Sequence, residues 1–355
     1  MDALFTHVLS QFQLDSPATS CQPHGCGHIN KTFLVDTESG NRYLLQKIGP
    51  AFKNVKILQE NISAVIDHLH TKTSDRYGAL TLIPTVDGGT YYHYEENSDW
   101  RVYEFVEGGI CLQAPETPED FYQSAVAFGT FQQQMADFPA RQLHETIPNF
   151  HHTPDRYRIF RETIAKDPVG RVKEVRAEIE FALAREEMAG KLIAMLEADE
   201  LPLRVTHNDT KLNNVMFRAC DRTPLCVMDL DTTMPGLSAY DFGDAIRFGA
   251  STAAEDEKDL NKVTMDLTMF RLFTQGFISA CPGLTEKEKE VLPLSAIIMT
   301  LECGVRFLTD YIDGDNYFGI HYPEQNLDRC HTQFKLVADM EEKWDAMTQI
   351  VNEAK

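Results

Sequence analysis

The sequence predicts an α+β fold with two lobes, a small N-terminal lobe built on an antiparallel sheet and a larger, mainly helical C-terminal lobe. At 355 residues the chain is longer than one ordinary hydrophobic core supports. Strand-like segments and hairpin turns concentrate in residues 1–107, whereas amphipathic helical spacing dominates residues 108–355. We therefore place the lobe boundary at residues 107 and 108.

The N-terminal elements follow from short apolar runs separated by turn residues. Apolar side chains recur at helical spacing over residues 4–12, which precede two glycines, Gly25 and Gly27. A second amphipathic helix is expected over 54–70. Strands are expected over 32–36, 42–48, 91–94 and 100–106, the first two joined by a hairpin turn over 38–41. These elements predict a sheet with one long helix.

The C-terminal region begins at a Gly108-Gly109 hinge and contains most of the expected helices. A Thr-Pro start signal precedes the first of them. Helices are expected over 118–135, 154–164, 171–198 and from 240 to 247, and short strands over 203–206, 215–217 and 225–228. A turn signal at 221–224 joins the last two strands.

The most informative motif lies between two of these strands. The stretch from His207 to Asn214 places Asp209 and Asn214 five positions apart on a short loop, and Asp229 ends the next strand. Phosphoryl transfer requires a carboxylate that orients the acceptor and takes its proton, together with oxygen ligands for magnesium. A turn in which Asp209 bonds nearby backbone groups is the alternative for that residue alone. The flanking strands and second carboxylate favour a phosphotransferase site.

The chain resembles the aminoglycoside phosphotransferase and choline kinase superfamily, whose members share the bilobal protein-kinase-like fold. It is similar above all to bacterial N-acetylhexosamine 1-kinases, and the resemblance extends over nearly the whole chain. The segments that carry it are Gly27-His28-Ile29-Asn30, Leu45-Gln46-Lys47-Ile48, Glu60-Asn61-Ile62, residues 205–214 (VTHNDTKLNN), residues 302–311 (ECGVRFLTDY) and Tyr317-Phe318-Gly319-Ile320-His321.

The resemblance implies an ATP site in the N-terminal lobe. Backbone N–H groups at the two glycines and the side chains of nearby polar residues would contact the phosphates. A lysine would pair with the α- and β-phosphates and with a glutamate on the following helix, and the hinge strand would contact adenine. The residues are Gly25, Gly27, Asn30, Thr32, Lys47, Glu60, Glu104 and Val106. An ordinary glycine turn and a solvated lysine are the alternatives.

The catalytic loop, in the same comparison, uses Asp209 as the base and binds magnesium through Asn214, Asp229 and Asp231. His207 and Asp241 are expected to support the loop. Asp241 begins an Asp-Phe-Gly sequence, but its expected role is to brace the loop through backbone hydrogen bonds rather than to bind metal.

The acceptor site is expected in the larger lobe around Asp209, with contributions from Thr232, Arg306 and Tyr317. His321 and Trp344 supply further polar and aromatic groups, although salt bridges or core packing would explain any of these side chains equally well. The resemblance predicts phosphorylation of the anomeric hydroxyl of N-acetylglucosamine or N-acetylgalactosamine. The alternatives are a kinase for choline, homoserine or an aminoglycoside, and a nucleotide-binding regulator without catalysis.

Composition limits the partners and the compartment. The formal net charge of −21 disfavours nucleic acid as a partner. The eight cysteines form no C-x-x-C pair, which favours free thiols in a reducing compartment. We expect no signal peptide and no uninterrupted apolar run of the ~18 residues that a membrane helix needs. These features predict a cytoplasmic enzyme with a small-molecule partner, and a monomer is the default.

Overall fold

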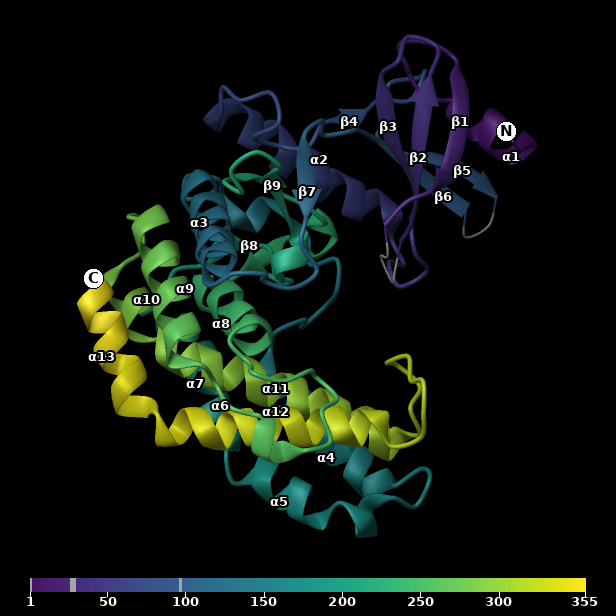
Figure 1. The fold of residues 1–355 in the computed structure, drawn as a ribbon. Coiled ribbons are helices and arrows are strands. Elements are labelled where there is room, and N and C mark those ends of the chain that lie inside the picture. The colour runs from purple at the N-terminus through teal and green to yellow at the C-terminus, as the bar shows by residue number, and fades with distance from the viewer. Residues whose placement is uncertain (1, 26–29, 96–97) are drawn as a thin grey trace. The chain divides into compact units, whose positions relative to one another are not determined.

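Six strands of the N-terminal region form one antiparallel sheet (Figure 1), and the structure, a computed structural model, describes residues 2–25, 30–95 and 98–355. The strands are β1 (Ala18–Pro23), β2 (Lys31–Thr37), β3 (Arg42–Lys47), β4 (Leu82–Ile83), β5 (Tyr92–Glu95) and β6 (Ser98–Glu104). The order is β1-β2-β3-β6-β4, with β5 also paired to β6. This register sets Gln46 of β3 opposite Thr32 of β2 and Arg101 of β6.

The expected strands and the hairpin turn are present, and Gly40 adopts the positive φ of 88° that the turn requires. Two strands of this sheet, β1 and β4, were not predicted from the sequence. β1 has a mostly polar sequence, ATSCQP, without apolar alternation, and β4 has only two residues. Neither segment shows the alternation of apolar residues from which a strand is predicted. Backbone pairing to neighbouring strands defines both of them.

Two helices accompany this sheet, α1 (Ala3–Leu9) and α2 (Val55–Lys72). Val8 and Leu9 of α1 join a hydrophobic cluster with Val35, Leu45 and Trp100 of the sheet. α2 begins where the Asn54 side chain accepts a hydrogen bond from the backbone of Ile57, and its apolar face is buried. The α+β fold class, with a sheet-rich N-terminal region and a helical C-terminal region, is confirmed.

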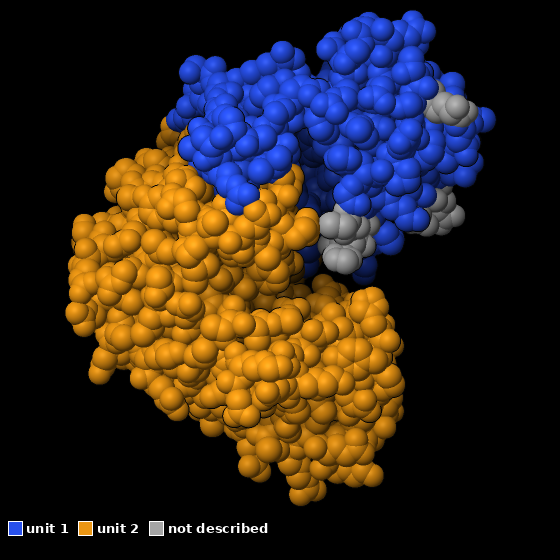
Figure 2. All heavy atoms as spheres, viewed as in Figure 1, with its two compact units in different colours: residues 1–110, 141–147, 216–234 blue, residues 111–140, 148–215, 235–355 orange. Residues whose placement is uncertain are grey.

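The chain divides into two compact units (Figure 2), one of residues 1–110, 141–147 and 216–234 and the other of residues 111–140, 148–215 and 235–355. Short strands complete the sheet structure. β7 (Gly109–Cys111), β9 (Val215–Arg218) and β10 (Pro224–Val227) form a three-stranded sheet, and β8 (Arg204–Thr206) pairs with β11 (Met234–Gly236). The 216–234 segment thus belongs to the same unit as the large sheet.

The second unit is mainly helical. Its helices are α3 (Pro118–Gln134), α4 (Thr153–Lys166), α5 (Arg176–Leu183), α6 (Glu186–Ala189), α7 (Lys191–Glu197), α8 (Ser238–Gly249), α9 (Leu267–Ala280), α10 (Glu286–Glu290), α11 (Leu292–Asp313), α12 (Gln325–Glu342) and α13 (Trp344–Ala354). α3 packs on α9, and α11 packs on both α12 and α8 (Figure 1). α11 is therefore the central helix of this unit.

One expectation needs correction here. The helix expected over 171–198 is broken into α5, α6 and α7, with residue Gly190 separating the last two. Among the described residues, α11 has the length and composition of a membrane span, although Glu302 and Arg306 interrupt its apolar run. Of its most apolar window, 78% is buried inside the protein, as in the core helix of a folded domain.

Gly243 allows α8 to approach α11 closely. A Cβ atom at this position would lie 2.5 Å from both the Ser295 carbonyl oxygen and the Met299 Cγ of α11. No real Cβ contact is that short, so the glycine of the Asp-Phe-Gly sequence serves helix packing. By contrast, a Cβ at Gly190 would meet no atom closer than 3.8 Å.

We therefore expect Gly243→Ala to lower the free energy of unfolding by about 1–3 kcal/mol through overpacking. Gly190→Ala is the matched control, because φ at Gly190 is −79° and the site has room. It should leave stability unchanged or raise it by up to about 1 kcal/mol. Urea unfolding of both variants measures the difference, and equal stabilities would contradict the packing role of Gly243.

Candidate active site

The catalytic loop follows β8 and is held by a buried carboxylate. Asp241, in the first turn of α8, accepts hydrogen bonds from the backbone N–H groups of His207 at 3.0 Å and Asn208 at 2.8 Å. Gln132 of α3 donates to the same carboxylate at 2.5 Å. Burial raises the pKa of Asp241. Asp241 therefore connects α8 to this loop through two backbone N–H groups, and the ring of His207 is buried beside Phe128.

Asp209 lies at the accessible edge of this loop. Its side chain keeps 30% of its exposure, and its Oδ1 atom is 2.9 Å from the Lys211 Nζ. Asn214 donates through Nδ2 to the Asp209 carboxylate at 3.0 Å and to its carbonyl oxygen at 2.8 Å. The predicted base and one predicted metal ligand are thus in direct contact within one unit.

Lys211 is a functional candidate that the sequence reasoning missed. Burial disfavours its ammonium group, but the carboxylates of Asp209 and Asp244 outweigh this effect and raise the pKa of Lys211. A lysine two positions after the expected base was the available signal. Asp244 was also missed; it accepts from the Thr210 backbone at 3.1 Å and holds the end of the same loop.

The side-chain oxygen of Asn214 has no hydrogen-bond partner among the described residues. The Nδ2 of the same side chain is occupied by Asp209. Asp229 is the second residue after β10; its φ is 53° and its side chain is exposed. Amide and carboxylate oxygens are suitable magnesium ligands. Among the described residues, no cluster of three His, Cys, Asp or Glu side chains could hold a metal.

Asp231 has a different environment from the one expected. One carboxylate oxygen is 2.6 Å from Arg101 Nη1 and the other accepts from Asn30 Nδ2 at 2.6 Å. Asp231 and Arg101 are only 2% and 1% exposed. Burial opposes the charge on Arg101, yet Asp231 raises its pKa. Because a protein group lies on each carboxylate oxygen, we expect Asp231 to anchor its segment to Arg101 rather than to act as the second metal ligand that the resemblance implied.

Arg101 and Asn30, the partners of Asp231, make further contacts in the large sheet. Arg101 also donates through Nε to Gln46 at 3.0 Å, and Gln46 donates to Thr32 at 3.0 Å. Asn30 accepts from the backbone of Gly49 at 2.9 Å. The side chains of Asn30 and Thr32, expected at the phosphates, are therefore engaged with other protein groups in this structure.

The remaining residues of the expected nucleotide site are near the same sheet. Lys47 is half-buried, with its Nζ 5.8 Å from the centre of the Trp100 ring. Glu60 pairs with His144 at 3.3 Å and Lys56 at 3.8 Å, so the expected pair with Lys47 is not formed. Gly25 has a φ of 74°, and Gly27 lies outside the described residues.

The hinge strand carries two further expected residues. Glu104 ends β6 and pairs with Arg76, and Val106 is buried. Arg42 pairs with Glu107 beyond the strand and lies 4.1 Å from the centre of the Phe105 ring. These contacts hold the side chains of the hinge in the first unit, so a nucleotide contact there would have to use backbone groups.

Three aromatic rings surround Arg306 in the second unit. Its guanidinium carbon lies 5.4 Å from the centres of the Phe150 and Phe318 rings and 5.9 Å from that of Tyr317. Arg306 is half-buried, and within the described residues it forms no hydrogen bond or ion pair. The Tyr317 ring is 68% exposed. Arg306 and Tyr317, expected in the acceptor site, are thus neighbours, whereas half-buried Thr232 belongs to the other unit.

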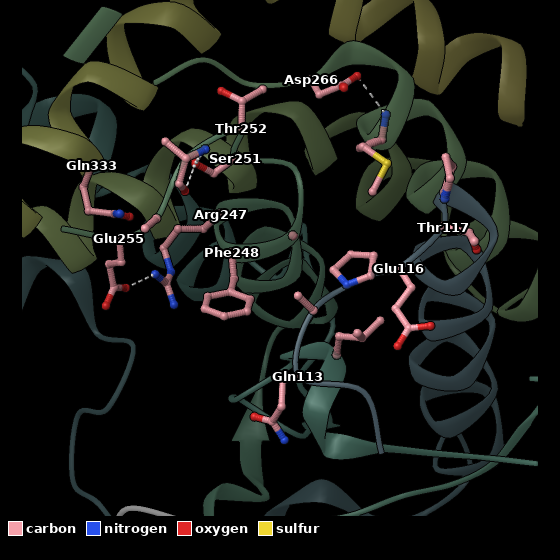
Figure 3. A pocket seen from close by; sticks show the side chains of 18 residues that line it. Gln113, Glu116, Thr117, Arg247, Phe248, Ser251, Thr252, Glu255, Asp266 and Gln333 are labelled. Atoms are coloured by element: carbon pink, nitrogen blue, oxygen red, sulfur yellow. Dashed lines mark hydrogen bonds and ion pairs between the residues drawn. The ribbon is translucent and has the colours of Figure 1, made fainter. Parts of the chain in front are cut away.

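The second unit also contains a cavity of about 550 Å³ (Figure 3). Leu212 of the catalytic loop lines it, together with residues 113–118 and 247–255. Arg247 and Glu255 form an ion pair of 2.8 Å at its wall. None of the predicted site residues lines this cavity, so the predicted acceptor side chains are a separate feature.

Comparison with known proteins identifies the family of this chain. A model of the phosphotransferase enzyme family matches residues 20–263. The chain belongs to this family. The recognition of the superfamily is confirmed, and the chain is a small-molecule phosphotransferase.

Solved structures share the fold. An aminopropanol kinase associated with a microcompartment matches with a TM-score of 0.68 at 16% identity, covering 97% of this chain and 98% of that one. An aminoglycoside phosphotransferase from Alicyclobacillus acidocaldarius matches with a TM-score of 0.65 at 15% identity, covering 98% and 96%. A choline kinase from Cryptosporidium parvum matches at 0.54 and 16%, covering 94% and 92%.

Proposed function

We propose that this phosphotransferase uses ATP and magnesium to phosphorylate the anomeric hydroxyl of N-acetylhexosamines, giving the sugar 1-phosphate. The observation that carries the choice of acceptor is the position of Arg306 among three aromatic rings. The proposal also assigns residues 1–107 to nucleotide binding and residues 108–355 to catalysis and acceptor binding. A cytoplasmic location, where ATP is available, is part of it.

The positive charge at Arg306 favours a neutral acceptor over a cationic one. A cationic acceptor such as choline or an aminoglycoside needs carboxylates or an aromatic cage that a cation can enter. Here a guanidinium already occupies the space between the rings, and Arg156 lies close to it. Burial and then the charge of Arg306 lower the pKa of Arg156. Two neighbouring arginines repel a cation but donate hydrogen bonds to hydroxyl and carbonyl oxygens, so they favour a neutral sugar.

Proton transfer is assigned to Asp209. When the acceptor oxygen bonds to the γ-phosphorus, the bond from that phosphorus to the bridging oxygen of ADP breaks, and Asp209 takes the acceptor proton. An anomeric hydroxyl is more acidic than an ordinary alcohol, so a carboxylate suffices. Lys211, 2.9 Å from Asp209, is placed to balance the negative charge near the transferred group.

Metal binding is assigned to the Oδ1 of Asn214 and the carboxylate of Asp229. Magnesium bound to the nucleotide neutralises the phosphate charge during transfer. Lys47, Gly25 and Gly27 are assigned to the phosphates, and the backbone at Glu104 and Val106 to adenine. Asn30, Thr32 and Glu60 would reach the nucleotide only by exchanging their present partners.

We expect Asp209→Asn to lower kcat by about a hundredfold or more, as the loss of a positioned base does. ATP binding, measured by calorimetry, should change little because the substitution removes no nucleotide contact. Asp199→Asn is the control, since Asp199 is an exposed aspartate with a φ of 56° that asparagine tolerates. An Asp209→Asn variant with half of the original kcat would remove Asp209 from the mechanism.

Asp229→Asn and Asp231→Asn should separate metal binding from anchoring. Asp229→Asn should raise the magnesium concentration for half-maximal rate by on the order of tenfold or more. Asp231→Asn should leave that concentration unchanged and lower the free energy of unfolding by about 3 kcal/mol, because Arg101 loses its buried partner. Magnesium titrations and urea unfolding measure these effects, and a magnesium shift in Asp231→Asn would restore that residue to the metal site.

A neutral acceptor predicts a kcat/KM for N-acetylglucosamine or N-acetylgalactosamine about a hundredfold or more above that for choline, homoserine or kanamycin. Arg306→Ala should raise the sugar KM about tenfold and leave the ATP KM unchanged, because one set of charged hydrogen bonds is lost. Arg158→Ala, at an exposed arginine of α4, is the control.

Phosphorus NMR of the product identifies the phosphorylated position. Preferred turnover of a cationic acceptor would overturn the sugar assignment, and a 6-phosphate product would overturn the anomeric one. An intact sugar KM in Arg306→Ala would leave Arg306 with a packing role.

A further inference from the structure

His151 connects the central helix α11 to the catalytic loop. Its Nδ1 is 2.8 Å from a carboxylate oxygen of Glu302, and its Nε2 is 3.3 Å from the carbonyl oxygen of Asn208. Thr153 donates to the other Glu302 oxygen at 2.6 Å. All of these side chains are buried, with Glu302 only 1% exposed. None of these contacts of His151 was predicted from the sequence.

The two partners of the His151 ring are both hydrogen-bond acceptors. A carbonyl oxygen has no proton to give, and an ionised carboxylate has none either. Burial raises the pKa of Glu302, but the contacts with His151, Arg306 and Thr153 lower it overall, which favours the ionised carboxylate. A hydrogen on each ring nitrogen satisfies both acceptors, and a ring that carries both hydrogens is an imidazolium.

Several charged and aromatic side chains surround the His151 ring. On α8, the carboxylate of Asp244 interacts electrostatically with His151. The centre of the Tyr240 ring lies 5.3 Å from the centre of the His151 ring. From α11, Glu302 contacts it and Arg306 is one turn further along the helix. On its own segment, Phe150 packs against it at 4.4 Å. Further cations act on these carboxylates, because Arg247 pairs with Asp244 at 2.9 Å, Lys211 also interacts with Asp244, and Arg156 interacts with Glu302. Glu302 is therefore the carboxylate that contacts the His151 ring directly.

The carbonyl that His151 holds belongs to the residue before the base. Asn208 has a φ of 66°, an uncommon conformation that needs support from its surroundings. Asp241 holds the N–H of Asn208 at 2.8 Å, and His151 holds its C=O at 3.3 Å. Both polar groups of this backbone unit are therefore fixed by buried ionisable side chains, which limits rotation of the peptide that carries Asp209.

We propose that His151 is a positioning residue that acts as a buried imidazolium, held by Glu302, and fixes the peptide plane between Asn208 and Asp209. The proposal rests on the proposed role of Asp209 as the base. It also places the support of the base and the acceptor residue Arg306 on one helix, four residues apart.

Nitrogen NMR of the histidine side chains tests the charge without any substrate. In the unmodified protein at neutral pH, both ring nitrogens of His151 should show imidazolium shifts and bound hydrogens. In Glu302→Gln, which removes the negative charge but keeps the shape, the ring should become neutral. A neutral ring in the unmodified protein would overturn the proposal. So would an unchanged imidazolium in Glu302→Gln.

Kinetics test the positioning. His151→Phe combined with Glu302→Leu removes the bridge without leaving a buried unpaired carboxylate, so the variant should fold. Its kcat should fall about tenfold or more, as expected from a lost charge-assisted hydrogen bond, with the ATP KM unchanged. Thr153→Val is the matched control, because it removes a hydrogen bond to the same Glu302 but leaves the contact with Asn208. It should lower the melting temperature and keep kcat.

The tests of His151 can succeed or fail independently of the proposed acceptor. If no sugar is phosphorylated, kcat is measured on the acceptor that the panel identifies, and the NMR result does not depend on the acceptor. A kcat within twofold of the original in the double variant, or an equal loss in Thr153→Val, would show that His151 acts only in stability.

Discussion

The buried carboxylate of Asp241 organises the catalytic region, because it accepts the two backbone N–H groups that a loop in this conformation cannot satisfy by itself. An unpaired buried N–H group is destabilising, so the loop and the first turn of α8 must stay together. α8 is in turn pressed against α11 through the space that Gly243 leaves. The position of Asp209 therefore depends on the packing of two helices that are distant in sequence.

A second buried charge plays a corresponding part in the other unit. Arg101 of β6 and Asp231 form an ion pair that is almost wholly withdrawn from solvent, and Asn30 completes it. Ion pairs of this kind contribute geometry more reliably than stability, because desolvation offsets much of their attraction. Here the pair joins the segment that bears Asp229 to the large sheet. The carboxylate proposed to bind magnesium is thus carried by an anchored segment.

The environment of Arg306 shows how one charge can select a substrate class. A half-buried guanidinium between aromatic rings interacts favourably with their faces and retains its N–H donors. The same rings without the arginine could receive a cation. The fold is shared by kinases of different alcohols, so the proposed choice of acceptor rests on the side chains around Arg306 rather than on the fold.

The fold class, seven of the strands and the helices of residues 1–249 could be predicted from local periodicity and turn residues, and the family and the role of Asp241 from the resemblance that the catalytic motif carries. The helices α9 to α13 were not predicted. The sequence did not reveal the Arg101–Asp231 pair, the bridge from His151 to Asn208, or the break near Gly190. Residues 101 and 231, and 151 and 208, are far apart in the chain, and nothing local indicates that they meet. Only tertiary structure decides which buried charges are partners, since that depends on how helices and strands pack.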